Sequence, residues 1–473
     1  MYLYFLYFCR MKRIFGSTHE DDEQKRGERF IMMTQSPVRQ LVMKMAGPTI
    51  ISMMVTALYN IIDAFFVGHI STEATAGVGV SFAYMTFINA IGFFFGHGSG
   101  NYISTALGAK KYDDAEKMAA TGFISSMMIG TIAAVAGLFF LSPLSRMMGA
   151  TPDVLHDSNN YLMFILIGTP FMMSSLTLNN QLRLQGNARY AMVGIATGAV
   201  LNIFLDALLI YGFGMGVMGA SLATCISQMV GWLILLLGTE KSGNVHIRLR
   251  LFTPTLRSYI DIFKGGIPSL CRHVFVCIST IMLNRYAAFY ADPGTEASAI
   301  AAFAIVSRVM MFAFSIILGI GQGFQPVCGF NYGAGLHERV RKSFIFTVEL
   351  STVILIFISI AYAIFAADII ELFRSEDQEL IKIGTRVMRW QCIAFPLVGV
   401  STVVNMMYQT TRKTLIATIL SMGRQGFFFI PAIMILPLFI GLRGVEMTQA
   451  VADALTFLLA LPFAIKETLD VRP

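Results

Sequence analysis

The chain alternates between long apolar stretches and short polar ones along almost its whole length. Each apolar stretch covers about 20 residues or more, the length that an α-helix needs to cross the hydrocarbon layer of a membrane. The polar connections between them are short, so neighbouring helices should run antiparallel. The pattern predicts an all-α integral membrane protein with twelve transmembrane helices, at 41–67, 76–106, 118–142, 158–181, 190–212, 216–238, 259–290, 298–331, 343–367, 382–408, 414–437 and 442–465.

The second half of the chain repeats landmarks of the first half in the same order. Pro170 and Asn179 return as Pro396 and Asn405, each 226 positions later. Such collinear matches indicate duplication of a unit of six helices. Because six is even, both halves should enter the membrane in the same orientation, as two six-helix bundles related by a pseudo-two-fold along the membrane normal with a cleft between them. The other repeated landmarks are Lys44-Met-Ala-Gly-Pro48 with Lys264-Gly-Gly-Ile-Pro268, Gly96-His-Gly98 with Gly321-Gln-Gly323, Leu107-Gly108-Ala109 with Tyr332-Gly333-Ala334, and Val217-Met-Gly219 with Leu442-Arg-Gly444.

This repeat divides the chain into expected domains. Most Lys and Arg residues lie in alternate short loops, which places both termini on the cytoplasmic side by the positive-inside rule. Residues 14–35 are polar and mixed in charge, which favours a tail over a folded domain. We expect a cytoplasmic N-terminal tail at 1–35, an N-lobe at 36–240, a cytoplasmic inter-lobe linker at 241–258, a C-lobe at 259–466 and a cytoplasmic C-terminal tail at 467–473.

Composition agrees with the hydropathy pattern. Hydrophobic residues make up 55% of the chain and charged residues 13%, and the mean hydropathy is +0.66, so there is more apolar surface than a soluble core can bury. The net charge of +7 could suggest nucleic acid, but its distribution between loops fits a membrane protein better. The six Cys form no CxxC pair and are expected to be small core residues.

Motifs of enzymes and of ATP binding are missing from the sequence. There is no GxxxxGK[ST] phosphate loop and no HExxH metal motif, and the seven His are scattered. Gly96-His-Gly98-Ser-Gly100 is flanked by apolar residues, which favours close helix packing over phosphate binding. We therefore expect no enzymatic activity and no cofactor.

Two acidic residues lie within apolar spans of the first half. A charge near the bilayer centre costs about 2.5 to 3.5 kcal/mol on insertion scales, so such residues are candidates for function. Asp63 follows Tyr59 and Asn60 by four and three positions, which places the three on one helical face. Asp206 follows Asn202 by one helical turn.

Both acids lie beyond the middle of spans that run outward, so they are expected at similar depth. Two carboxylates in a dry site cannot both ionise cheaply, so at least one holds a proton unless a cation neutralises the pair. Carboxylate, amide and hydroxyl oxygens also suit a hard cation such as Na⁺, and Thr224 could add another oxygen. The residues predict a coupling site for H⁺ or Na⁺ at Asp63, Asn202, Asp206 and Thr224, supported by Tyr59 and Asn60; helix capping or cross-linking is the structural alternative.

The second half differs because its candidate buried charges are largely basic. We expect some of these arginines to reach an interface or to pair with Glu349 or Asp453. They are Arg272, Arg285, Arg308, Arg389 and Arg424. Placement beside the expected cleft also gives a set of candidate substrate-contacting residues, Met172, Ser175, Asn179, Phe303 and Asn405.

Several stretches resemble the multidrug and toxic compound extrusion (MATE) family over about residues 36–465. They are Ala57-Leu-Tyr-Asn60-Ile-Ile-Asp63 with Val67-Gly68, Gln185-Gly186-Asn187, Leu201-Asn202-Ile-Phe-Leu-Asp206 and its continuation, Gly216-Val-Met-Gly219-Ala220 leading to Ala223-Thr224, and Gln325-Pro326 through Asn331-Tyr332-Gly333-Ala334-Gly335. The resemblance implies an N-lobe cation site at Asp63, Asn202, Asp206 and Thr224. Some branches carry a glutamate in the seventh span, where this chain has Arg272 and Arg285, so a C-lobe Na⁺ site is not expected.

Within that family the sequence is most similar to the bacterial MepA-like branch, which implies export of lipophilic and often cationic drugs. The leading hypothesis is a monomeric secondary antiporter of the cytoplasmic membrane that exchanges drugs for H⁺ or Na⁺ and alternates access between its lobes. Its partners would be the lipid bilayer and small molecules. A flippase for lipid-linked oligosaccharide or peptidoglycan precursors is the alternative, kept open by Arg272, Arg308 and Arg424. A passive channel would not depend on Asp63.

Overall fold

The computed structural model of the chain describes residues 19–68, 72–242, 244–374 and 376–469, and every regular element within these residues is a helix. Twelve helical segments are long and apolar enough to cross a membrane, which confirms the predicted spans. Most run a few residues beyond the predicted limits, as Leu155–Leu184 does for 158–181. The reason is that polar first and last turns continue a helix after its apolar stretch has ended.

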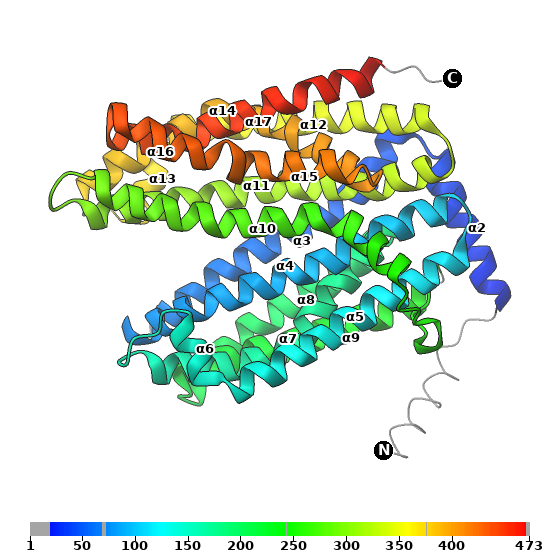
Figure 1. Cartoon of the computed structure of the whole chain (residues 1–473), viewed down its shortest axis with the longest axis horizontal. Helices are drawn as coiled ribbons and strands as arrows, with labels where there is room; N and C mark the ends of the chain where they lie inside the picture. The colour runs from blue at the N-terminus through cyan, green and yellow to red at the C-terminus, as the bar shows by residue number, and fades with distance from the viewer. Residues whose placement is uncertain (1–18, 69–71, 243, 375, 470–473) are drawn as a thin grey trace. The chain divides into compact units, whose positions relative to one another are not determined.

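The helices of the first half follow one another with short connections (Figure 1). They are α2 (His19–Gln35), α3 (Val38–Gly68), α4 (Thr72–Gly108), α5 (Tyr112–Phe139), α6 (Leu141–Met147), α7 (Leu155–Leu184), α8 (Ala188–Asp206), the π-helix η1 (Ala207–Gly212) and α9 (Gly216–Ser242). The second half holds the 3₁₀-helix η2 (Leu249–Leu251), α10 (Leu256–Tyr290), α11 (Glu296–Gly333), α12 (His337–Ile364), α13 (Ala366–Glu371), α14 (Gln378–Thr410), α15 (Thr414–Met422), the π-helix η3 (Gly423–Phe427), α16 (Phe429–Ile440) and α17 (Leu442–Leu469).

The described residues form two compact units, and each unit consists of separate stretches of the chain. Unit 1 takes the residues up to Leu41 together with Tyr59–Gly266 and Gly329–Leu336. Unit 2 takes Val42–Leu58, Ile267–Cys328 and the residues from His337 onward. The middle of α3, Val42–Leu58, therefore belongs to unit 2, whereas both of its ends belong to unit 1. The lobe limits drawn at 36–240 and 259–466 remain a prediction.

Helix α7 is the centre of unit 1. It packs against α4, α5, α8 and α9, and its apolar window is 72% buried, the highest share among the twelve spans. Tyr161, Leu162 and Ile165 of α7 lie in one apolar cluster with Tyr84 and Ile88 of α4. Because this helix meets protein on several sides and little lipid, it can carry polar residues that a lipid-facing helix could not.

Helix α14 has the same central place in unit 2. It packs against α12, α13, α15 and α17, and Figure 1 shows α16 beside α17 in orange and red. Asp377 caps its start by accepting from the backbone N–H of Leu380 at 3.0 Å. The hydroxyl of Ser298 donates to the same carboxylate at 2.6 Å. These two hydrogen bonds, that from Ser298 foremost, lower the pKa of Asp377.

Glycines let α4 approach α7 closely. A Cβ on Gly92, Gly96 or Gly100 would lie 2.8, 2.8 and 2.5 Å from side-chain atoms of Leu176, Asn180 and Leu184 respectively. Both sets of residues recur every four positions, so one ridge of α7 lies along a groove of α4. Close helix packing, predicted for the glycines at 96–100, is confirmed.

Helix α2, which covers residues 19–35 of the predicted tail, belongs to unit 1. Arg26 of α2 forms an ion pair with Glu116 of α5 at 2.5 Å. Arg29 donates to the carbonyl of Gly186 at 2.8 Å and to the side-chain oxygen of Asn187 in the turn between α7 and α8. Burial lowers the pKa of Arg29. Polar composition misleads here because the charged side chains of α2 find specific partners on unit 1.

We expect Gly96→Leu to destabilise the protein, because its side chain would enter space that Asn180 occupies. Overpacking of this kind costs about 1 to 3 kcal/mol. The measurement is the melting temperature of the protein purified in detergent. Gly79→Leu is the matched control, since Gly79 lies on the same helix with no atom within 4 Å of a Cβ placed there. Equal melting temperatures for the two variants would contradict this account of the α4–α7 contact.

Candidate functional site

Asn202, Asp206 and Thr224 come together in the interior of unit 1. Asp206 is the last residue of α8, Asn202 lies one turn before it, and Thr224 lies on α9. Their exposed fractions are 1%, 0% and 1% for Asn202, Asp206 and Thr224. The Asn202 nitrogen lies 3.5 Å from Asp206 Oδ1 and 3.3 Å from Thr224 Oγ1. The predicted grouping of these three residues is therefore present in the structure.

The Asn202 amide can also take the opposite orientation, in which its bonds are better. Its nitrogen then donates to Asp206 Oδ2 at 2.9 Å, and its oxygen accepts from the backbone N–H of Thr224 at 3.3 Å. This orientation satisfies both ends of the amide, so we favour it. In either orientation the amide joins the carboxylate of α8 to α9.

Asp206 stands where the helix changes its geometry. The π-helix η1 begins at Ala207, directly after it, and continues to Gly212. A π-turn contains one residue more than an α-turn and is frequent at functional sites. The carboxylate thus lies at a point where the backbone ladder is irregular and protein surrounds it.

The remaining members of the predicted coupling site lie on α3. The side chains of Asp63 and Asn60 fall outside the described residues, so their place beside Asp206 remains a prediction. The backbone of α3 is helical from Val38 to Gly68, which keeps Tyr59, Asn60 and Asp63 on neighbouring turns. Tyr59 is half-buried and belongs to unit 1.

Two residues proposed to contact substrate, Asn179 and Asn405, form equivalent hydrogen bonds in the two units. The Asn179 amide nitrogen donates to the carbonyl of Ala191 at 3.0 Å in unit 1. The Asn405 nitrogen donates to the carbonyl of Ala417 at 2.8 Å in unit 2, and also to Ser421 Oγ at 2.8 Å. Each pair spans twelve positions, and each residue of the second pair follows its counterpart by 226 positions. The repeat seen in the sequence is thus a repeat of contacts.

The other three candidates for substrate contact lie in the interior of their own units. Met172 is 5% exposed within the apolar cluster of α4 and α7, and Ser175 is buried on α7. Phe303 is 2% exposed within the main apolar cluster of unit 2. Their contribution to a substrate cavity remains a prediction.

One buried carboxylate of unit 2 has a basic partner. Asp453 of α17 accepts from Arg424 Nε at 2.8 Å and from the Gln449 amide at 2.8 Å, as the pairing proposed from sequence requires. The Arg424 guanidinium also lies 4.4 Å from the ring centre of Phe314. Arg424 sits in η3, so a second π-helix accompanies a second buried carboxylate. Asp453 is therefore balanced by a positive charge in its own unit.

The other arginines of the second half are placed differently. Arg285, Arg308 and Arg389 are exposed on unit 2, and Glu349 is exposed as well, so these three candidate arginines are not buried within the unit. Long side chains near the ends or on the outer face of a helix can leave the interior.

Arg386 was not singled out from sequence. Its Nε donates to both oxygens of the fully buried Glu446 carboxylate at 3.1 Å, and its Nη2 donates to Glu446 Oε1 at 2.6 Å. Sequence spacing gave no sign of this pair, since its members are 60 positions apart.

Sequence reasoning also missed a buried arginine in unit 1. Arg183 is 1% exposed and donates to Asn180 Oδ1 at 2.5 Å, and its Nη2 lies 3.3 Å from His97 Nε2. The predicted span ended at 181, which left Arg183 in a loop, but α7 continues to Leu184. The position of Arg183, only two residues beyond the predicted apolar span, could have indicated that it is buried.

Comparison with known proteins identifies the architecture. The family model described as MatE matches residues 48–208 and 276–435, once in each half of the chain. The chain belongs to the MATE family. The two matches begin at 48 and 276, a spacing close to that of the repeated landmarks, so the duplication inferred from sequence is a property of the MATE model as well.

Curated relatives match almost the full chain. Multidrug export protein MepA of Staphylococcus aureus (strain MSSA476) is 27% identical over 438 residues, which covers 92% of this chain and 95% of the relative. Among solved structures, a MATE protein in complex with MaL6 has a TM-score of 0.87 at 24% identity, covering 93% of this chain and 98% of that one. A MOP superfamily transporter from Pyrococcus furiosus has a TM-score of 0.85 at 25% identity, with the same coverage. These structures confirm the two-lobe, twelve-helix MATE fold.

We expect Asp453→Asn to lower the melting temperature substantially. The change leaves the Arg424 charge without its carboxylate in a largely buried site, and breaking such pairs costs about 3 to 5 kcal/mol. The double variant Arg424→Met/Asp453→Leu should recover most of the loss, because apolar side chains replace both charges. Lys382→Met, which breaks the exposed pair with Glu379, is the control and should change stability by under about 1 kcal/mol. An Asp453→Asn protein as stable as the wild type would refute the assignment.

Proposed function

We propose that this protein is a secondary active multidrug exporter, which moves lipophilic or cationic drugs outward in exchange for inward H⁺ or Na⁺. Membership in the MATE family and the full-length match to a multidrug export protein support the export function. The observation that carries the coupling mechanism is the buried cluster of Asn202, Asp206 and Thr224. No enzymatic step and no cofactor is part of the proposal.

The chemistry of the cluster explains how an ion could drive the cycle. A fully buried carboxylate is costly unless its charge is balanced, and Asp206 is 0% exposed. A proton or a monovalent cation at the carboxylate would supply that balance. Binding and release of the ion then change the relative free energies of the inward-open and outward-open states, which is what coupling requires.

The same residues offer oxygen ligands to either ion. The Asp206 carboxylate alone suffices for a proton, whereas Na⁺ would use the amide oxygen of Asn202 and the hydroxyl of Thr224 as well. Asp63 would complete the site from α3. We propose a monomer in the cytoplasmic membrane with both termini inside, which agrees with the distribution of Lys and Arg between the loops.

The flippase alternative is not favoured. It requires a strongly cationic cleft for a lipid pyrophosphate, for which Arg272, Arg308 and Arg424 were the candidates. Arg424 is engaged by Asp453 at 2.8 Å, so its charge is compensated within unit 2. The matching curated relatives are multidrug export proteins.

We expect Asp206→Asn to abolish gradient-driven efflux while the protein still reaches the membrane, because an amide cannot exchange a proton or balance a cation. Asp63→Asn should have the same effect. The measurement is ethidium transport in everted membrane vesicles under an imposed H⁺ or Na⁺ gradient. Asp113→Asn is the control for the same chemical change, since Asp113 is exposed in the first turn of α5. Wild-type efflux by Asp206→Asn would eliminate the coupling role.

Thr224→Val should distinguish Na⁺ from H⁺ as the coupling ion. The substitution keeps the shape of the side chain and removes only the hydroxyl oxygen. If Na⁺ is the coupling ion, we expect about a 5- to 30-fold rise in the Na⁺ concentration needed for half-maximal efflux, because the loss of one ligand is worth about 1 to 2 kcal/mol. If H⁺ is the coupling ion, efflux under a pH gradient should be nearly unchanged. A large loss of proton-driven efflux would contradict the ligand role assigned to this hydroxyl.

A further inference from the structure

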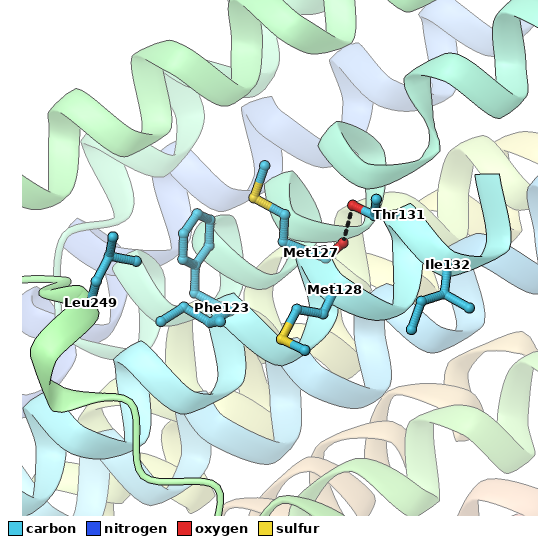
Figure 2. Close-up of a pocket in the computed structure, with 7 residues that line it drawn as sticks. Phe123, Met127, Met128, Thr131, Ile132 and Leu249 are labelled. Atoms are coloured by element: carbon cyan, nitrogen blue, oxygen red, sulfur yellow. Dashed lines mark hydrogen bonds between the residues drawn. The ribbon is translucent and has the colours of Figure 1, made fainter. Parts of the chain in front are cut away.

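Unit 1 carries an apolar groove on the outer side of α5, away from the buried cluster around Asp206. Phe123, Ile124, Met127, Met128, Thr131 and Ile132 of α5 line it, and Leu249 of η2 closes one end (Figure 2). Its volume is about 340 Å³. A groove of this size lies at the lower end of the range that holds a small ligand.

The groove is lined almost entirely by apolar side chains. Its one polar side chain is Thr131, whose hydroxyl donates to the carbonyl of Met127 at 2.8 Å within α5, the bond that Figure 2 marks. The methionines add flexible and polarisable surface that adapts to an irregular chain. The lining therefore selects a flexible apolar occupant, such as a hydrocarbon chain.

Leu249 is held in place by bonds on both sides of η2. Before it, the Asn244 side chain donates to the carbonyl of Gln185 at 2.9 Å. After it, the backbone N–H of Thr253 donates to Thr121 Oγ1 at 3.2 Å, on the turn of α5 that precedes the groove. The end of the groove is thus a fixed feature of the linker, although Leu249 itself is 77% exposed.

Two arginines flank Leu249 at this end. Arg248 and Arg250 are both exposed, and neither forms an ion pair with another residue in the described part of the chain. The predicted topology places this linker on the cytoplasmic side, where anionic lipids give the membrane surface a negative potential. An apolar groove with two exposed arginines beside its end has the polarity of a phospholipid with an anionic headgroup.

We infer that the α5 groove binds an anionic phospholipid of the cytoplasmic leaflet. One acyl chain lies along Phe123 to Ile132, and the headgroup phosphate lies against Arg248 and Arg250. Because η2 belongs to the linker between the halves of the chain, the lipid would stabilise the position of that linker on α5. This site is separate from the proposed transport function and does not depend on it.

The test measures lipid binding to the purified full-length protein by native mass spectrometry, with thermal stabilisation by added lipid as a second readout. The probe is palmitoyl-oleoyl phosphatidylglycerol, and phosphatidylcholine with the same chains is the competitor. We expect preferential retention of phosphatidylglycerol, and Arg248→Gln/Arg250→Gln should weaken it about 30-fold. Arg248→Lys/Arg250→Lys should retain most of the binding, because it keeps both charges.

Matched controls separate the groove from general attraction to the membrane surface. Lys111→Gln/Arg189→Gln removes two exposed charges from other loops predicted on the same side, and should leave binding unchanged. Thr131→Trp fills the groove and should reduce retention of both lipids. Ile129→Trp puts the same bulk on an exposed position of α5 outside the groove and should not.

Three results would overturn the inference. One is equal loss of phosphatidylglycerol in the Lys111/Arg189 control, which would assign the preference to overall charge. Another is undiminished binding in Thr131→Trp, which would remove the acyl chain from the groove. The third is stabilisation by inorganic phosphate as large as that by the lipid, which would leave a simple anion site at the arginines.

Discussion

Polar groups that leave water must find hydrogen-bond partners within the protein, and this requirement constrains both the backbone and the buried side chains of this chain. Inside the hydrocarbon layer, a backbone amide or a carboxylate must find its partner within the protein, and this is why the described spans are helices. The same constraint explains the side-chain bonds at the centre of each unit. Asn179 and Asn405 each reach a backbone carbonyl of the following helix, and Asp453 is held by Arg424 and Gln449. An ion-coupling site, by contrast, needs a buried polar group that an incoming ion can still bind.

The two halves keep one plan of packing and differ in how they treat buried charge. The central helices α7 and α14 occupy corresponding places in the duplicated sequence, and each is surrounded by helices of its own unit. In unit 2 the buried carboxylates Asp453 and Glu446 are neutralised by arginines. In unit 1 the carboxylate of Asp206 is joined to a neutral amide and a hydroxyl-bearing residue. The proposed coupling site lies in unit 1.

The sequence was sufficient for the spans, the duplication and the grouping of Asn202, Asp206 and Thr224, because hydropathy, spacing and helical periodicity are local properties. It was insufficient where a partner is distant in the chain. Arg386 and Glu446 could not be paired by spacing, and Arg183 was hidden by an underestimated helix end. The substrate candidates stay a prediction: Met172 and Phe303 lie in apolar clusters of their own units, and burial within a unit does not decide whether a substrate contacts them.

The attachment of α2 has a consequence for how the polypeptide can be shortened. Hydropathy alone would suggest that residues before the first span are dispensable, and recombinant membrane proteins are often trimmed on that basis. Here a chain beginning after residue 35 would lack Arg26 and leave Glu116, only 8% exposed, without the charge that faces it. The turn at Gly186 and Asn187 would lose its guanidinium donor as well. The folded part of the chain therefore includes α2, which begins well before the first membrane-spanning helix.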